Sequence, residues 1–229
     1  MIKHHPDLIQ GSEEWAAARC GLLTASEMKL IVTPTLKSAR NDKERAHLYE
    51  LLAQRITGYV EPSYVSDDML RGQEDEIQAR ALYAEHYAPV EDVGFITNDE
   101  WGFTLGYSPD GLVGDDGLIE CKSRKQRYQI ETLVEAVTTN TPPAEYMLQL
   151  QTGLLVSGRK WIDFISYSGG LHMAVIRVFP DARIQDAILE ATAGFERRLA
   201  EKMAAYRAVV ASAARLLPTE RRVEVEMFV

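Results

Sequence analysis

The sequence predicts an α/β or α+β core in which one mixed β-sheet is flanked by helices. Three observations lead to this prediction. The first third of the chain repeats apolar residues at helical spacing, and the middle contains short β-favouring runs separated by turn residues. A helix, two strands and a long final helix follow them. Helices that precede, interrupt and follow a group of strands are typical of a sheet covered by helices.

The N-terminal third is expected to be helical. Residues 12–31 begin with a serine followed by two glutamates, which is a helix-start signal, and Gly21 divides them into two helices. Apolar side chains recur at helical spacing over residues 41–57, where Gly58 provides a stop. They recur again over residues 74–86, so a further helix is predicted there.

The middle of the chain changes from a helical to a strand-like pattern. Residues 90–97, 102–107 and 118–122 are short β-favouring runs, and turn-forming residues at 98–100 and 114–117 separate them. Three strands are therefore expected in this part of the chain.

The last third alternates again between the two patterns. We expect a helix over residues 143–156 and strands over residues 161–167 and 172–179. Residues 168–170 (Ser-Gly-Gly) are a hairpin signal between those strands. A long helix rich in Ala, Glu and Arg is predicted from 181 to about 216.

Length and composition describe an ordinary globular protein. The 229 residues contain 46% hydrophobic and 26% charged side chains, which excludes collagen-like, coiled-coil and disordered classes. No linker or repeat divides the chain, so a single domain over residues 1–229 is expected. Only Cys20 and Cys121 are present, which indicates a reducing, cytoplasmic compartment. No run approaches 18 apolar residues, so neither a membrane span nor a membrane partner is expected.

The charge balance excludes one class of nucleic-acid-binding protein. The formal net charge is −9, whereas proteins that coat nucleic acid nonspecifically are usually basic. An enzyme can still act on DNA when its positive charge is gathered on one surface.

The most informative stretch runs from Ser108 to Lys122. Asp110 lies at a turn between two predicted strands, and Glu120 and Lys122 lie two residues apart on the second of them. Because side chains alternate along a strand, Glu120 and Lys122 share a face while Cys121 points to the core. A tight hairpin would bring Asp110 beside Glu120.

This set of side chains suits hydrolysis of a phosphodiester. Two neighbouring carboxylates need a cation between them, and oxygen ligands favour Mg²⁺ or Mn²⁺. Lys122 could position or deprotonate a water, or offset charge on a phosphoryl oxygen. Each piece alone has a simpler explanation, because Pro-Asp is a common turn former and Glu-x-Lys is often a surface ion pair. The combination on adjacent strands favours function.

Other residues give weaker signals. Glu76 lies on the predicted helix 74–86 as a candidate metal ligand, or as part of a solvated face. Gln149 and Gln151 lie on a mostly apolar helix and are candidates for positioning water, or are exposed. A basic cluster of Lys122, Arg124, Lys125 and Arg127 could dock a phosphate backbone, or form a solvated loop.

The sequence resembles the phage lambda exonuclease/YqaJ viral recombinase family of the PD-(D/E)xK nuclease superfamily. Four motifs occur in order: Gln10-Gly11-Ser12-Glu13-Glu14-Trp15 through Arg19 to Thr24-Ala25-Ser26; Arg71-Gly72 with Glu76 to Ala79-Arg80; Ser108-Pro109-Asp110-Gly111-Leu112 with Glu120-Cys121-Lys122; and Tyr146-Met147-Leu148-Gln149-Leu150-Gln151. Any one is weak, but their order and spacing together are specific. The resemblance implies a restriction-endonuclease-like core, a central mixed β-sheet flanked by helices.

The resemblance also implies an activity and partners. Such enzymes degrade one strand of linear double-stranded DNA from 5′ to 3′, release 5′-mononucleotides and leave a 3′ single-stranded tail. They use Mg²⁺, and a single-strand annealing protein usually loads on the tail. The best-known member is a homotrimeric ring around DNA, so a homo-oligomer is expected.

The family roles transfer to particular positions. Asp110, Glu120, Glu76 and the backbone carbonyl of Cys121 match metal ligands, and Lys122 matches the catalytic lysine. Gln149 and Tyr146 match helix positions beside the active site, and Arg19, Ser26 and Ser108 match residues that bind the 5′-phosphate and DNA. A guanidinium suits bidentate phosphate binding, although Arg19 could instead pair with Glu13 or Glu14. A PD-(D/E)xK endonuclease and a noncatalytic DNA-end or recombinase-binding module are the alternative functions.

Overall fold

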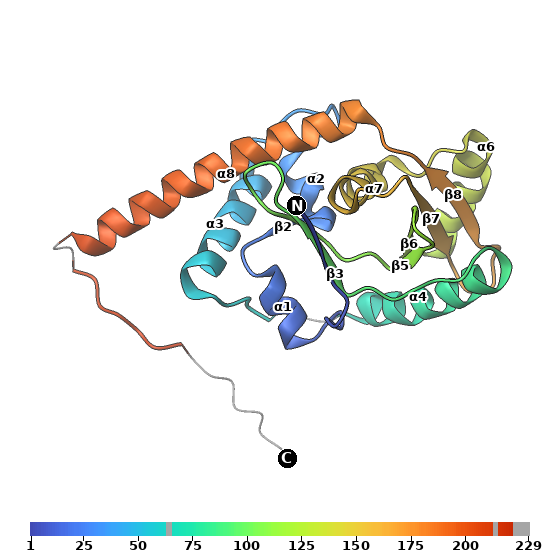
Figure 1. The fold of residues 1–229 in the computed structure, drawn as a ribbon, viewed down its shortest axis with the longest axis horizontal. Helices are drawn as coiled ribbons and strands as arrows, with labels where there is room; N and C mark the ends of the chain where they lie inside the picture. The colour runs from blue at the N-terminus through green and yellow to red at the C-terminus, as the bar shows by residue number, and fades with distance from the viewer. Residues whose placement is uncertain (63–65, 213–214, 222–229) are drawn as a thin grey trace, which may run out of the picture.

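In the part of the chain that the structure describes, eight strands form two four-stranded mixed sheets with helices around them (Figure 1). The structure is a computed structural model that describes residues 1–62, 66–212 and 215–221. The α/β class with mixed strand pairing and flanking helices is therefore confirmed, but the strands divide between two sheets where the sequence pattern predicts one.

The first sheet joins two strands near the N-terminus to two from the middle of the chain. Its order is β1-β3-β4-β2; β3 pairs antiparallel with β1 and β4, and β2 pairs parallel with β4. The strands are β1 (Ile2–His5), β2 (Leu23–Thr24), β3 (Phe95–Asn98) and β4 (Leu105–Tyr107).

The second sheet follows the order β5-β6-β7-β8. Strands β5 and β6 form an antiparallel hairpin, β6 and β7 run parallel, and β7 pairs antiparallel with β8. The strands are β5 (Gly111–Val113), β6 (Gly117–Ser123), β7 (Trp161–Tyr167) and β8 (Ala174–Val178).

Helices connect and cover the two sheets. They are α1 (Glu13–Arg19), the 3₁₀ helix η1 (Ala25–Glu27), α2 (Met28–Ile31), α3 (Asp42–Thr57), α4 (Asp67–His86), α5 (Gln126–Glu131), the π-helical η2 (Thr132–Ala136), α6 (Val137–Thr139), α7 (Ala144–Ser157) and α8 (Ala182–Ala211). Helix α7 contacts β3 and β4 of the first sheet and β7 of the second, and α4 contacts β6 and β7. In Figure 1, α7 lies between the labelled strands of the two sheets. Helix α7 therefore joins the two sheets at the centre of the molecule.

Local sequence signals explain where several helices begin and end. The Ser12 hydroxyl accepts a hydrogen bond from the Trp15 N–H (3.1 Å) at the start of α1. Asn41 caps α3 in the same way, through the Glu44 N–H (3.0 Å). Gly58 ends α3 with φ 64°, a left-handed conformation that glycine adopts without strain.

Three predicted boundaries differ from the structure. Strand β3 begins at Phe95 where 90 is predicted, because Glu91 makes only an isolated bridge to Leu112. Strand β4 begins at Leu105 where 102 is predicted, because Gly102 has φ 80° and interrupts the extended chain. Helix α4 begins at Asp67 where 74 is predicted.

The prediction for the final helix is also too long. Helix α8 ends at Ala211, because Ser212 is extended (φ −73°, ψ 158°), and residues 215–221 are not helical. Part of the predicted extension, residues 213–214, lies outside the described residues. Across the part of the chain that the structure describes, none of the helices combines the length and apolar character needed to cross a membrane.

Candidate active site

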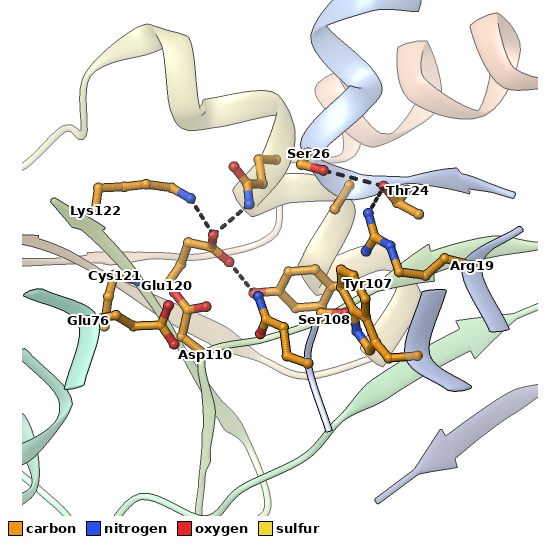
Figure 2. Close-up of a pocket in the computed structure, with 14 residues that line it drawn as sticks. Arg19, Thr24, Ser26, Glu76, Tyr107, Ser108, Asp110, Glu120, Cys121 and Lys122 are labelled. Atoms are coloured by element: carbon orange, nitrogen blue, oxygen red, sulfur yellow. Dashed lines mark hydrogen bonds and ion pairs between the residues drawn. The ribbon is translucent and has the colours of Figure 1, made fainter. Parts of the chain in front are cut away.

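Most of the predicted site residues line one pocket of about 270 Å³ (Figure 2). In that view Asp110, Glu120 and Lys122 lie on one side of the Tyr107 ring, and Arg19 and Thr24 lie on the other. The pocket is lined by Gln10, Trp15, Arg19, Thr24, Ala25, Ser26, Glu76, Tyr107, Ser108, Asp110, Glu120, Cys121, Lys122 and Gln149. Both sheets, α1, η1, α4 and α7 therefore contribute to a single cavity.

The chain passes from the first sheet to the second within this pocket. Strand β4 ends at Tyr107 and β5 begins at Gly111, so Ser108 and Asp110 lie in the short connection between sheets. The β5–β6 hairpin pairs Gly111 with Ile119. It places Asp110 beside β6, where its Oδ2 accepts a hydrogen bond from the Cys121 N–H (2.5 Å). The predicted proximity of Asp110 to the Glu-x-Lys strand is therefore confirmed.

Glu120 is the most densely bonded carboxylate in the pocket. Its side chain is 2% exposed. Its Oε1 accepts hydrogen bonds from Lys122 Nζ (2.6 Å) and Gln149 Nε2 (2.5 Å), and its Oε2 accepts one from Tyr107 Oη (2.7 Å). Glu120 and Lys122 thus share a face of β6, as the strand pattern predicts.

Burial and mutual repulsion perturb the acidic groups. Burial, reinforced by the negative charges of Glu120 and Glu76, raises the pKa of Asp110 well above its usual value. Burial also raises the pKa of Glu76; the positive charge of Arg80 lowers it in part, and the negative charge of Glu120 raises it further. For Lys122, burial opposes the charged form, but the carboxylates of Glu120 and Asp110 outweigh it and raise the pKa of the ammonium. The pocket therefore concentrates negative charge around one cation.

The ligand types in the pocket suit a hard divalent cation, although the side chains do not form a preorganised metal-binding cluster. Carboxylate oxygens and backbone carbonyls are the ligands that Mg²⁺ and Mn²⁺ favour. Within residues 1–62, 66–212 and 215–221, no three His, Cys, Asp or Glu side chains form a cluster that could hold a metal ion. Protein donors also engage both oxygens of Glu120 and one oxygen of Asp110.

The opposite end of the pocket presents a half-buried guanidinium. Arg19 stacks over the Trp15 ring, with Cζ 4.3 Å from the ring centroid, and its Nη2 donates to Thr24 Oγ1 (3.1 Å). Trp15 in turn donates from Nε1 to Ser108 Oγ (2.9 Å), and Thr24 Oγ1 lies 3.3 Å from Ser26 Oγ. Burial lowers the pKa of Arg19, although the nearby Glu27 raises it.

The salt bridge considered for Arg19 does not form. Among the described residues no carboxylate lies within ion-pair distance of its guanidinium, so Glu13 and Glu14 are not its partners. An arginine held by an aromatic ring and a hydroxyl keeps most of its donors available for an anion.

Tyr146 lies next to this pocket rather than in it. Its ring is 5.7 Å from Lys122 Nζ and stacks on Phe164, and its hydroxyl accepts a hydrogen bond from Arg124 Nη1 (2.5 Å). It lines an adjoining pocket together with Gln149 and Lys122. The predicted position beside the site is correct, but its hydroxyl is already bonded to the protein.

The basic cluster after β6 divides into two side chains bonded inside the protein, Lys122 and Arg124, and two exposed ones, Lys125 and Arg127. Arg124 is buried and forms an ion pair with Glu145 (2.6 Å), and Lys125 pairs with Asp68 (3.0 Å). Arg127 donates to the Tyr128 hydroxyl. Lys125 and Arg127 therefore stay exposed at the surface, and phosphate docking by these two residues remains a prediction.

Sequence reasoning assigned no role to Tyr107, Trp15 or Thr24. Tyr107 holds Glu120, and Trp15 and Thr24 orient Arg19. A signal for Tyr107 exists, because it immediately precedes the Ser-Pro-Asp turn on a predicted strand. Nothing local indicates that its hydroxyl reaches a carboxylate 13 residues further on.

Comparisons with known proteins show the family to which this chain belongs. A family model, the YqaJ-like viral recombinase domain, matches residues 14–160. No curated protein matches the sequence. The crystal structure of an alkaline exonuclease (LHK-Exo) from Laribacter hongkongensis is similar, with 33% identity and a TM-score of 0.77, over 89% of this chain and 100% of that one.

Two further solved structures are similar. LHK-Exo in complex with dAMP matches with 35% identity and a TM-score of 0.71, over 87% of this chain and 100% of that one. A phage-related exonuclease from Haemophilus somnus 129PT has 15% identity and a TM-score of 0.55, over 80% and 96% of the two chains, so it shows the shared fold alone. The family match covers most of the chain, including every motif residue from Glu14 to Gln151, and this protein therefore belongs to the YqaJ-like viral recombinase family.

Proposed function

We propose that this protein is a Mg²⁺-dependent exonuclease that digests one strand of linear double-stranded DNA from 5′ to 3′ in the cytoplasm. The products are 5′-mononucleotides and a 3′ single-stranded tail, on which a single-strand annealing protein loads. Family membership and the similarity to LHK-Exo support an exonuclease. The family resemblance supports the polarity, the annealing partner and a trimeric ring.

One observation carries the proposal. A single pocket contains both a carboxylate–lysine group (Asp110, Glu120, Lys122) and a guanidinium without a carboxylate partner among the described residues (Arg19). The first group suits hydrolysis of a phosphodiester, and the second suits binding of a terminal phosphate. At about 270 Å³ the cavity is near the lower limit of ligand pockets, which favours one nucleotide between the two groups.

Asp110, Glu120, Glu76 and the Cys121 carbonyl would hold Mg²⁺. The buried, mutually repelling carboxylates fit a divalent cation, because its charge offsets the burial and the repulsion that raise the pKa of Asp110 and Glu76. When bound, the ion polarises the phosphoryl oxygen and stabilises charge on the leaving oxygen.

The chain itself orients the attacking water and the DNA end. Lys122 and Gln149 donate to the same oxygen of Glu120, so a water beside that carboxylate meets an ammonium and an amide in fixed positions. Arg19, with Ser26 and Ser108 nearby, holds the terminal 5′-phosphate and sets the direction of digestion. Attack of water on the next phosphorus breaks its bond to the 3′ oxygen and releases one 5′-mononucleotide. The dAMP bound to LHK-Exo is a deoxynucleoside monophosphate of the class that this step would release.

Digestion of end-labelled DNA tests the proposal. Linear duplex labelled at either 5′ or 3′ ends, and covalently closed circles, are incubated with the protein in Mg²⁺ or in EDTA. We expect release of the 5′ label first, intact circles, and no release in EDTA. Lys122→Ala should lose cleavage by at least about 100-fold while remaining folded by circular dichroism.

Each other outcome identifies a different function. Nicked circles would indicate an endonuclease, and no nucleotide release in Mg²⁺ would indicate a noncatalytic DNA-end module. Digestion by Lys122→Ala at the wild-type rate would reject this site.

A further inference from the structure

A second pocket, of about 230 Å³, adjoins the active-site pocket. It is lined by Ala25, Ser26, Lys29, Lys122, Glu145, Tyr146 and Gln149. Four of these residues, Ala25, Ser26, Lys122 and Gln149, also line the active-site pocket. The two pockets are therefore neighbouring parts of one groove that share these four residues.

Pairing among the residues that the structure describes leaves one cation available in this second pocket. Lys122 is bonded to Glu120 (2.6 Å), and Glu145 is bonded to the buried Arg124 (2.6 Å). Lys29 makes no side-chain hydrogen bond or ion pair with any residue that the structure describes. The pocket therefore presents a positive charge next to the position proposed for cleavage.

Lys29 is exposed on a backbone that is held rigidly. It lies on α2, three residues after Ser26, and side chains at that spacing share a helix face. Its neighbours Met28 and Ile31 are buried in the main core at 0% and 1% exposure. The core thus fixes the backbone of Lys29, while its exposed side chain lines the second pocket.

We propose that Lys29 binds a backbone phosphate of the DNA next to the one being cleaved. The inference rests on the proposed function and extends it, because it assigns a substrate contact in the pocket that adjoins the active-site pocket. The phosphate can come from the cleaved strand, 3′ to the scissile bond, or from the complementary strand. An ammonium on a flexible stem suits either, since it acts as a point charge without bidentate geometry.

DNA binding without divalent ions tests the contact separately from cleavage. The dissociation constant for a 5′-phosphorylated duplex end is measured in EDTA at several salt concentrations. The variants are Lys29→Ala, Lys29→Arg and a control, Lys202→Ala, which removes the same charge from an exposed site on α8.

We expect Lys29→Ala to bind DNA about tenfold more weakly than the wild type. This factor is at the lower end of the range expected when a hydrogen bond to a charged group is lost. Its salt slope should fall by about 1, as for loss of one phosphate contact. Lys29→Arg and Lys202→Ala should bind like the wild type.

Neutral linkages identify the source of the phosphate. A methylphosphonate placed at the second linkage of the cleaved strand, or opposite it in the complementary strand, removes one charge. A methylphosphonate at the linkage that Lys29 contacts should weaken DNA binding by the wild type and leave DNA binding by Lys29→Ala unchanged. If Lys29→Ala binds with the affinity and salt slope of Lys202→Ala, the inference is wrong. A wild type that binds DNA ends but releases no nucleotide in Mg²⁺ would instead reject the proposed function.

Discussion

Asp110→Asn should stabilise the metal-free protein while abolishing its activity. Asn has nearly the same shape and keeps an oxygen that can accept the Cys121 N–H, so the β5–β6 connection is preserved. The substitution removes a buried negative charge that Glu120 and Glu76 repel. Functional sites commonly retain such unfavourable groups at a cost in stability.

The size and pH dependence of the effect follow from the environment of Asp110. Burial and repulsion oppose the charged form, and Lys122 and one N–H offset them in part, so we expect a gain of about 1 kcal/mol. That gain corresponds to a rise in Tm of roughly 2–4 °C for a chain of this size. The folded-state pKa of Asp110 lies above its unfolded value near 3.8. At a pH between these two values, the folded protein therefore binds more protons than the unfolded protein. Wild-type stability therefore falls as pH rises through that window, and the advantage of Asp110→Asn should be larger at pH 8 than at pH 5.

Thermal unfolding with and without Mg²⁺ checks this reasoning. In EDTA the variant should unfold at the higher temperature. In Mg²⁺ at 100 times its dissociation constant, the wild type should gain about 2.7 kcal/mol and the variant much less, which reverses their order. A variant that is less stable in EDTA, or that gains as much from Mg²⁺ as the wild type, would refute the electrostatic argument.

Three further substitutions test separate parts of the structure. Arg19→Ala should reduce kcat/KM on 5′-phosphorylated ends by about tenfold or more and leave 5′-hydroxyl ends unchanged, and equal losses on both would reject a terminal-phosphate pocket. Tyr83→Phe removes the hydroxyl that donates to the buried Asp163 (2.6 Å), so urea unfolding should show a loss of about 1 kcal/mol, with Arg177 still bonded to that carboxylate. Gly153→Ala would place a methyl group 2.8 Å from Tyr107 Cζ, which should lower the free energy of unfolding by about 1–3 kcal/mol and slow digestion. Gly169→Ala serves as its control, because a methyl group there has no atom within contact distance.

The parts of the site that follow from local rules were predictable. Strand alternation places Glu120 and Lys122 on one face, and the hairpin brings Asp110 to the same strand; both are present. The helix pattern in the sequence does not distinguish Gln149 from Gln151 as the candidate for positioning a water. The structure separates them, because residues two apart on a helix point in different directions. Gln149 reaches Glu120, whereas Gln151 is buried and bonds to the β8–α8 connection at the Phe179 carbonyl and Asp181 N–H.

The parts that depend on distant pairing were not predictable. Strand β2 has only two residues, Leu23–Thr24, and its partner β4 lies more than 80 positions further along the chain. Strand β1 precedes the first helix and pairs with residues 95–98. The helical stretch from α5 to α6 was also missed, because exposed Ile130, Val134 and Val137 obscure its amphipathic pattern. Division of the strands into two sheets follows from these contacts and not from any local pattern.

That division explains how an acidic chain brings a guanidinium and a carboxylate–lysine group into one pocket. The groups that orient Arg19 come from the first sheet and the helices before it, and the carboxylates and Lys122 come from the second sheet and α4. The Tyr107 hydroxyl crosses between the sheets to Glu120, and Gln149 reaches the same residue from the helix that contacts both. The two halves of the pocket therefore have the correct separation only when the sheets are packed against α7. A substitution that loosens this packing, such as Gly153→Ala beside Tyr107, should consequently reduce activity more than its cost in overall stability alone would suggest.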